Sequence, residues 1–437
     1  SRIPTRKFTT IQSAIDASFN GYTILVDDGV YREAINFKGK EITLRGNVIS
    51  PENCIIDGQN EDGTPVQAPD WSRPSWDPTK VSIVTVDTRE PGDCYDGDAP
   101  NELESGPDSA LDFERIMEGF TIRNGTSGTR YPSIEPGCEP CIFTQQGKVI
   151  CECPENCFGP DAPINCTDDQ CPGTGIDAFV GGGIWIYRSY LTVNNCVFTN
   201  NSSDGGGGAF VRESNVVFLS CDFDSNTSGS NGGGLQLNHT ISNVIRCNFT
   251  NNQIVPLEKA PSSGSGAGIH VFSGTCTLNT CTITDNHATE NGGGISMALI
   301  RTNSFEHLFG DVNVNDCVIE NNTSSGDDGC GGLQLNSTSQ DGATPDAKLI
   351  LLRTTICNNV RGEDSILSNF CINATSIPEE DMWDDNGGNV ICAEAAIEIN
   401  AVVSPDGFEA GIDTVDVAVE VEQGELDSIQ YQWYIEE

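Results

Sequence analysis

A cysteine and an asparagine recur five residues apart along the middle of the chain, and this repeat constrains the fold more than any other feature. The cysteines are Cys196, Cys221, Cys247, Cys281 and Cys317, and the asparagines are Asn201, Asn226, Asn252, Asn286 and Asn322. Two residues after each cysteine stand Phe198, Phe223, Phe249, Ile283 and Ile319. The first two intervals are 25 and 26 residues, and later intervals are longer. Short segments at one recurring repeat predict a solenoid of stacked β-coils.

Each unit also begins with a glycine cluster, for example at 205–208 and 232–234, followed by alternating apolar residues. The apolar pairs are Ile184/Ile186, Ala209/Val211, Leu235/Leu237, Ile269/Val271, Ile295/Met297 and Leu333/Leu335. Extra residues fall at 253–265, 298–313 and 337–348, between the repeated positions. Connecting segments absorb insertions more readily than strands do, so we expect the strands to keep their register.

The two repeated columns predict different roles in such a stack. Identical amides one coil apart can hydrogen-bond along the stack, so the asparagines are expected to form a structural ladder. We assign the cysteines to the core, because a free cysteine packs as a small apolar residue. A metal site is disfavoured, since ligands along a straight column do not converge tetrahedrally.

Charge excludes several classes of partner. The chain of 437 residues has 64 Asp and Glu against 22 Lys and Arg, for a formal net charge of -42. Such a charge repels nucleic acid and anionic lipid, and it repels acidic polysaccharides unless divalent cations bridge the two. No apolar run approaches the ~20 residues that cross a bilayer, so no membrane insertion is expected.

The cysteine content indicates an extracellular or cell-surface location. Nineteen cysteines occur together with many Asn-x-Ser/Thr sequons, as in secreted proteins. The candidate glycosylation sites are Asn124, Asn165, Asn200, Asn238, Asn248, Asn321, Asn336 and Asn373. Sequons also fall on Asn201, Asn226 and Asn322 of the asparagine column. Chance occurrence in a chain rich in Asn and Thr is the alternative. We expect a removed leader, or a boundary, before Ser1.

The chain resembles the right-handed parallel β-helix proteins of the pectate-lyase-like superfamily. The resemblance rests on residues 8–17 (FTTIQSAIDA), 21–31 (GYTILVDDGVY), 35–45 (INFKGKEITLR), 51–58 (PENCIIDG) and 119–125 (GFTIRNG). It covers about residues 8–392. It implies an all-β fold, a right-handed parallel β-helix over 1–394, and says little about activity, because this architecture hosts lyases, hydrolases, esterases, adhesins and fibres.

The resemblance also implies a short helix that caps the open end of the solenoid. Ile11, Ala14, Ile15 and Ala17 would supply its apolar face, with Thr9 or Thr10 as the N-cap residue.

The sequence nominates no catalytic residue. The Gly-His-Gly and Arg-x-Lys elements of polygalacturonases and the Leu-Gly-Arg-Pro-Trp element of pectin esterases are absent. A lyase needs a basic residue beside calcium-binding carboxylates, and nothing in the sequence pairs any arginine with an acidic cluster. We interpret Arg188, Arg212 and Arg246 as outward residues that balance the acidic surface. The four histidines (His239, His270, His287 and His307) are interpreted as scattered surface residues.

Two insertions into the β-helix are expected. The first, at 88–111, is acidic, and Asp93, Asp96 and Asp98 crowd oxygen donors around a glycine, so these three residues form a candidate calcium site. A solvated acidic loop is the alternative reading.

The second insertion, at 128–178, is rich in cysteine, proline and glycine. It holds Cys138, Cys141, Cys151, Cys153, Cys157, Cys166 and Cys171. A segment with so few apolar residues needs cross-links to hold a structure. Disulfides are favoured over zinc as these cross-links, because the chain is expected to be secreted. The seventh cysteine could pair with Cys94, Cys330 or a neighbouring chain. We expect this insertion to present an interaction surface.

The repeat stops near residue 395. Residues 396–403 (AIEINAVV), 414–421 (TVDVAVEV) and 429–434 (IQYQWY) alternate as strands do. The last is similar to a strand of immunoglobulin-like and polycystic-kidney-disease-like domains. Residues 395–437 are therefore expected to form an incomplete β-sandwich.

Two hypotheses of function follow. The favoured one is a secreted, glycosylated structural rod in an extracellular filament, matrix or cell-surface appendage such as a flagellar hair. Its partners would be copies of itself or other fibre proteins. The alternative is a calcium-dependent polysaccharide lyase, or a carbohydrate-binding adhesin, on the same fold.

Overall fold

The computed structural model divides the chain into two units, Ser1–Ala395 and Ala396–Glu437. The structure describes residues 7–67, 82–87, 114–127, 142–143, 149–150, 181–255, 264–299, 310–326, 329–337, 348–362, 366–374 and 383–392. All of these residues belong to the first unit. The expected sandwich strands at 396–434 therefore lie outside the described residues.

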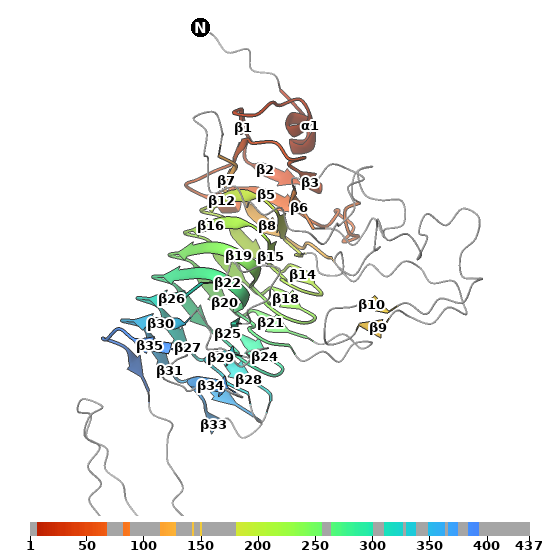
Figure 1. The fold of residues 1–437 in the computed structure, drawn as a ribbon. Coiled ribbons are helices and arrows are strands. Elements are labelled where there is room, and N and C mark those ends of the chain that lie inside the picture. The colour runs from red at the N-terminus through yellow and green to blue at the C-terminus, as the bar shows by residue number, and fades with distance from the viewer. Residues whose placement is uncertain are drawn as a thin grey trace, which may run out of the picture. The chain divides into compact units, whose positions relative to one another are not determined.

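The first unit is a parallel β-helix, as the repeat predicted (Figure 1). Successive coils add strands to three sheets, and most coils add two strands to the largest of them. The largest sheet has 17 strands. These are β1 Thr23–Leu25, β3 Ile35–Asn36, β4 Thr43–Arg45, β6 Val84–Asp87, β7 Ile116–Glu118, β11 Ile184–Tyr187, β12 Tyr190–Asn194, β15 Ala209–Arg212, β16 Asn215–Leu219, β19 Leu235–Ile245, β22 Ile269–Asn279, β25 Ile295–Leu299, β26 Val312–Asn315, β29 Leu333–Ser337, β30 Leu349–Leu352, β34 Phe370–Ala374 and β35 Trp383–Asp385.

The other two sheets have 10 and 7 strands. The 10-stranded sheet holds β2 Gly29–Tyr31, β5 Cys54–Asp57, β8 Thr121–Arg123, β13 Val197–Thr199, β17 Asp222–Asp224, β20 Asn248–Thr250, β23 Thr282–Thr284, β27 Val318–Glu320, β31 Thr355–Cys357 and β36 Val390–Ile391. The 7-stranded sheet holds β14 Ser202–Ser203, β18 Thr227–Ser228, β21 Gln253–Ile254, β24 His287–Ala288, β28 Thr323–Ser324, β32 Val360–Arg361 and β33 Ile366–Leu367. Separately, β9 Ile142–Phe143 and β10 Val149–Ile150 form an antiparallel pair.

The largest sheet consists of two rows of strands that meet at a corner. In most coils a strand of one row ends before a strand of the other begins, as β15 does before β16. In β19 and β22 the two rows join into single strands of 11 residues. The backbone turns the corner in the left-handed region, with φ of 44° at Arg188, 47° at Glu213, 51° at His239 and 54° at Ser273.

Inward side chains form one continuous apolar core. The predicted apolar pairs are buried throughout, and Phe198, Phe223 and Phe249 stack with ring centroids 4.8 and 4.7 Å apart. Stacked rings follow directly from the parallel register, which pairs Phe198 with Phe223 and Phe223 with Phe249. The cysteine column lies in this core as five buried free thiols, and the expected core role is confirmed.

The asparagine column lies at the turn between the second and third sheets. Each asparagine from Asn201 to Asn322 donates both its backbone N and its Nδ2 to Oδ1 of the next asparagine, at 2.9–3.1 Å. The series continues through Asn359 to Asn369. Every member is at most 1% exposed, so the amides satisfy donors that water cannot reach.

The capping helix is α1, Ile11–Asp16, and Thr10 is its N-cap, accepting from the backbone N of Ser13. Its expected apolar face is only half correct. Ile11 and Ile15 are buried, but Ala17 lies beyond the last helical residue and is exposed. Gln12 is buried in its place, because its amide exchanges hydrogen bonds with the backbone of Asn36 in β3.

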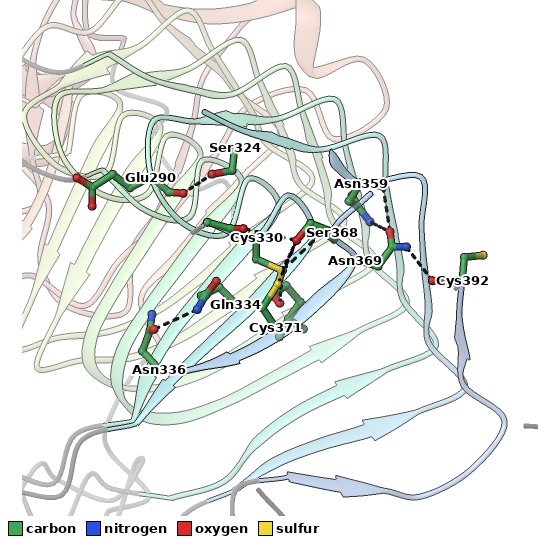
Figure 2. The surroundings of a disulfide bond; sticks show 12 residues. Glu290, Ser324, Cys330, Gln334, Asn336, Asn359, Ser368, Asn369, Cys371 and Cys392 are labelled. Atoms are coloured by element: carbon green, nitrogen blue, oxygen red, sulfur yellow. Dashed lines mark hydrogen bonds between the residues drawn. A yellow bond between two sulfur atoms is a disulfide. The ribbon is translucent and has the colours of Figure 1, made fainter. Parts of the chain in front are cut away.

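Two disulfides join the last coils. Cys330 pairs with Cys371 (Figure 2). Cys357 pairs with Cys392. The sequence offered Cys330 as a partner for the insertion at 128–178, and that suggestion is wrong. Cys330 instead lies in the turn before β29, where the next coil brings Cys371 of β34 beside it.

Candidate functional site

A row of outward-facing side chains crosses the first part of the large sheet. One position recurs on consecutive coils, between two inward core residues of each strand. Its occupants, from β6 to β29, are Thr85, Trp185, Phe210, Gln236, His270, Ser296 and Gln334. We call these residues the outer row. Outward side chains of a sheet usually meet water, yet every member is at most 7% exposed.

The polar half of the outer row has buried atoms without hydrogen-bond partners. These atoms are Oε1 of Gln236, Nδ1 of His270, Oγ of Ser296 and Oε1 of Gln334, from four consecutive coils. Each glutamine uses its other amide atom: Nε2 of Gln236 donates to Oδ1 of Asn238 at 3.3 Å, and Nε2 of Gln334 donates to Oδ1 of Asn336 at 3.2 Å (Figure 2). A buried polar group without a partner costs about 1–3 kcal/mol, so four in a row mark a place with unmet hydrogen-bonding capacity.

Two of the three described histidines are buried, contrary to the interpretation of the histidines as surface residues. His239 and His270 are buried, and His287 is half-buried with Nδ1 at 2.6 Å from Oγ1 of Thr323. His307 lies outside the described residues. Burial lowers the pKa of His270 to about 4, so its ring is neutral at pH 7. The error arose because the alternation of apolar and polar residues predicts whether a side chain points into or out of the core. It does not predict whether an outward side chain is exposed to water.

Two other members of the outer row, Trp185 and Phe210, are aromatic. Trp185 stacks with Tyr187 of the same strand, with ring centroids 5.9 Å apart and planes inclined by 19°. Together with Phe210 they form a buried apolar cluster separate from the main core. Aromatic faces beside hydrogen-bonding amides are a common combination in ligand sites.

A buried ion cluster borders the aromatic residues at the corner of the sheet. Oε2 of Glu213 accepts from Nε of Arg188 at 2.8 Å and from the Tyr187 hydroxyl at 3.3 Å, and its Oε1 accepts from Nε of Arg212 at 2.9 Å. Burial raises the pKa of Glu213, but Arg212 and Arg188 outweigh it, and the net pKa is lowered. The carboxylate is therefore ionised, with both oxygens held by cations.

This cluster corrects the interpretation of the arginines. Arg188 and Arg212 share a buried carboxylate, and Arg123 donates twice to Oδ2 of the buried Asp57. Only Arg246 is exposed as expected. The pairing was not visible in the sequence because Arg188 and Glu213 are 25 residues apart and meet through register alone.

The segments predicted as insertions, 88–111 and 128–178, are next in sequence to described residues near the outer row. The chain leaves β6 at Asp87, which pairs with Tyr187 in the adjacent strand. The second segment, 128–178, falls between the described residues Ser127 and Gly181, and Gly181 is three residues before β11. Sites in repeat folds often lie where insertions leave one face.

The calcium and disulfide candidates of the insertions cannot be placed. Asp93, Asp96 and Asp98, and all seven cysteines from Cys138 to Cys171, lie outside the described residues, as does Asn165. Within the described ranges, no three His, Cys, Asp or Glu side chains are grouped to hold a metal ion. These assignments remain predictions.

The sequons fall into three groups. Asn200, Asn248 and Asn321 are exposed. Asn124, Asn238 and Asn336 are partly exposed, and Nδ2 of Asn124 donates to Oδ1 of Asp57 at 2.9 Å. Asn373 lies in β34 in register with Asn336. The ladder residues Asn201, Asn226 and Asn322 are buried with their Nδ2 atoms engaged, so a glycan cannot be attached to them in the folded protein.

Sequence reasoning missed the outer row, although one signal was present. The triplet Gln-Leu-Asn occurs twice, at 236–238 and 334–336. Each copy follows a glycine cluster, and its asparagine is the first residue of a sequon. Both copies give the same Gln-to-Asn hydrogen bond. No helix among the residues that the structure describes is long and apolar enough to cross a membrane.

Comparisons with known proteins identify the fold. A family model described as the right handed beta helix region matches residues 176–307. No curated protein sequence matches the chain. The solved structure of pectin methylesterase PemA from Erwinia chrysanthemi is similar at 11% identity, over 91% of this chain and 89% of that chain, with a TM-score of 0.33. The family 28 exopolygalacturonase of Yersinia enterocolitica is similar at 11% identity, over 90% and 76%, with a TM-score of 0.27.

At these TM-scores the two likenesses do not bear on activity. The family match agrees with the resemblance seen in the sequence, and so does the pairing in the three sheets, which is parallel in every described pair except β32 with β33. The fold is a right-handed parallel β-helix.

Proposed function

We propose that the protein is an extracellular carbohydrate-binding protein and that the outer row is its glycan-binding site. The observation that carries the proposal is the line of four buried polar atoms without partners, from Gln236 to Gln334, continued by Trp185 and Phe210. Sugars present hydroxyl groups on their edges and apolar faces on their rings. Amide oxygens and aromatic rings complement these two kinds of surface.

The geometry of the row suits a linear polymer. Adjacent coils are about 4.8 Å apart, which is close to the length of one pyranose unit in an extended chain. Each coil of the row could therefore meet one sugar residue. A compact small molecule would use only one or two of the coils.

Binding without cleavage fits the charged groups beside the row. Hydrolysis of a glycosidic bond uses a pair of carboxyl groups, one of which gives up or takes a proton. Glu213 is the carboxylate that the described residues place in the ion cluster, and both of its oxygens are held by arginines. It is therefore poorly suited to proton transfer, and no catalytic role is proposed for it.

An extracellular location is supported by the two disulfides that join the last coils. Disulfides persist in oxidising compartments and are rare in the cytosol of mesophiles. The net charge of -42 would also favour solubility at an exposed surface.

A glycan array followed by calorimetric titration tests the proposal. Replacing Trp185 with leucine keeps apolar volume but removes the aromatic face, and we expect about tenfold weaker binding of whichever glycan the wild type selects. The matched control is Tyr190→Leu, on β12 in the other row of the same sheet, which should bind normally. The proposal fails if no glycan binds, or if both variants weaken binding equally.

The structural rod remains a second candidate, favoured by a separate observation. The first coil exposes Phe19, Tyr22 and Leu25, at 70%, 54% and 72%, beside β1, whose one described partner is β4. An exposed apolar edge of this kind can pair with another chain. Electron microscopy of the protein across a range of concentrations tests this. Filaments that Tyr22→Lys disrupts would support it, and monomers at all concentrations would contradict it.

A further inference from the structure

We infer that the ligand of the outer row is an uncharged polysaccharide, which donates hydroxyl hydrogens to Gln236 and Gln334, and that polyuronates are excluded. The inference rests on the proposed function and names its class of ligand. It follows from the direction of the hydrogen bonds that the row lacks, together with the net charge of the chain.

The two glutamines decide this direction. In each, Nε2 donates one of its two hydrogens to the asparagine two residues later, and Oε1 is buried without a donor. An amide oxygen can only accept a hydrogen bond. A ligand that completes both sites must therefore bring hydrogens, as the hydroxyl groups of a sugar do. Uronates also have hydroxyl groups, so it is charge that separates them from neutral sugars.

The two residues between the glutamines allow the same ligand. Ser296 has a hydroxyl that can donate or accept, and His270 has a buried Nδ1 on a ring that burial keeps neutral. The row from Gln236 to Gln334 spans three steps between coils, about 14 Å. Roughly three sugar residues would cover that length, with the polymer running across the strands.

Long-range charge points to the same class. The formal net charge of -42 opposes the approach of any polyanion. The nearest described cations, Arg188 and Arg212, both hold Glu213. A carboxylate placed opposite Gln236 would set acceptor against acceptor in a site shielded from water, which is costly.

Calorimetry with two matched panels tests the inference. One panel holds uncharged hexasaccharides of glucan, mannan, xylan and galactan, and the other holds hexamers of galacturonate, mannuronate and guluronate. Protein is produced without N-glycosylation, because Asn238 and Asn336 are sequons beside the row and their own glycans could occupy it. Polyuronates are measured with and without calcium, and then with a chelator.

Two double variants test whether the glutamines accept hydrogen bonds from the ligand or donate to it. One variant removes the acceptor atoms, and the other keeps them. Gln236→Leu with Gln334→Leu removes both acceptors, and we expect about 10- to 100-fold weaker binding of the neutral sugar. Gln236→Glu with Gln334→Glu is measured at pH 5, where burial keeps the two carboxyl groups protonated. Each protonated carboxyl keeps a carbonyl acceptor for the ligand and gives its single O–H to the asparagine, so binding of the neutral sugar should remain within a fewfold of wild type at the same pH. If the amides instead donate to the ligand, the glutamate pair will lose binding as completely as the leucine pair.

The outcomes are distinct. Binding of a neutral hexasaccharide that the leucine pair loses and the glutamate pair keeps would support the inference. Binding of uronates alone would overturn it while leaving carbohydrate binding intact. Binding of neither panel would remove the proposed function itself. Melting temperature controls for folding: the leucine pair removes two buried acceptors without partners, so the unliganded protein should melt at the wild-type temperature or above it.

Discussion

Asn252 gives two hydrogen bonds to one atom of Asn286, its neighbour in the next coil. Its backbone N lies 3.0 Å and its Nδ2 2.9 Å from Oδ1 of Asn286, 34 residues further along the chain. Asn286 repeats the same pair of bonds to Asn322. One side chain thus satisfies the backbone of the preceding coil while its own backbone is satisfied by the following coil. The ladder ends only where a coil has no asparagine at this position. Each asparagine inside the ladder is hydrogen-bonded to the asparagine of the coil before it and to that of the coil after it.

Replacing Asn286 with alanine should therefore destabilise the protein strongly. Two buried donors of Asn252 lose their acceptor, so we expect the free energy of unfolding to fall by about 4 kcal/mol. Urea unfolding followed by circular dichroism measures this. The control is Asn248→Ala on the exposed face of β20, which should change stability by less than about 0.5 kcal/mol. Equal effects of the two substitutions would contradict the structural importance of the ladder.

Acid should destabilise the protein through His270. The pKa of this residue is about 4 in the folded state, against the ordinary value of 6.5, so the unfolded chain takes up the proton first. The contribution to stability is complete above pH 6.5 and is lost as the pH falls toward 4. Between pH 7 and pH 5 the loss should be about 2 kcal/mol.

The variant His270→Gln isolates this contribution, because the outer row already accommodates glutamine at Gln236, one coil away, and at Gln334, two coils away. We expect the variant to lose about 2 kcal/mol less than the wild type over the same pH interval. Parallel pH profiles for the two proteins would show that His270 does not titrate as described.

Removing the charge of Glu213 should leave Arg188 and Arg212 without the carboxylate that they share. We expect Glu213→Gln to lower the free energy of unfolding at pH 7 by about 3 kcal/mol. The pKa of Glu213 is lowered in the folded state, so its contribution is present above pH 4.5 and disappears as the pH falls through the folded pKa. The difference between wild type and variant should therefore shrink in acid. Glu320→Gln, in β27, serves as the control and should be close to neutral.

Breaking the disulfide between Cys357 and Cys392 should loosen the last coil. The bond closes a sequence separation of 35 residues, and its loss should cost about 4 kcal/mol by the chain-entropy relation. Hydrogen exchange of the double variant Cys357→Ala/Cys392→Ala should accelerate in β31 and β36. Exchange in β13, several coils away, should not change. Uniform acceleration along the stack would indicate that the coils unfold as one unit.

The core cysteines should resist alkylation. Seven described thiols are free and buried: Cys54, Cys196, Cys221, Cys247, Cys276, Cys281 and Cys317. Burial raises the pKa of Cys196 and of Cys276 to about 12, so thiolate is scarce at pH 8. Site-resolved mass spectrometry after iodoacetamide treatment should find these seven unmodified until urea is added. Modification of Cys221 or Cys247 in the native protein would contradict the core assignment.

The sequence by itself determined the stack. Cys221, Asn226 and their equivalents recur in one frame because each coil repeats the same local environment, and a parallel register places identical positions on one another. Core direction followed from alternation, as at Leu235 and Leu237, and the N-cap followed from Thr10. These features are local or periodic, so a single chain displays them without any knowledge of contacts.

Only the tertiary structure decided the outer row, the ion cluster and the disulfide pairs. Gln236, His270 and Ser296 share no residue type, and each belongs to a different coil. Glu213 meets Arg188, and Cys330 meets Cys371, through register across 25 and 41 residues. The alternation of apolar and polar residues predicts which side chains point away from the core. It does not predict which residues cover them or which residues complete their hydrogen bonds. Those depend on how the coils and their insertions come together in space.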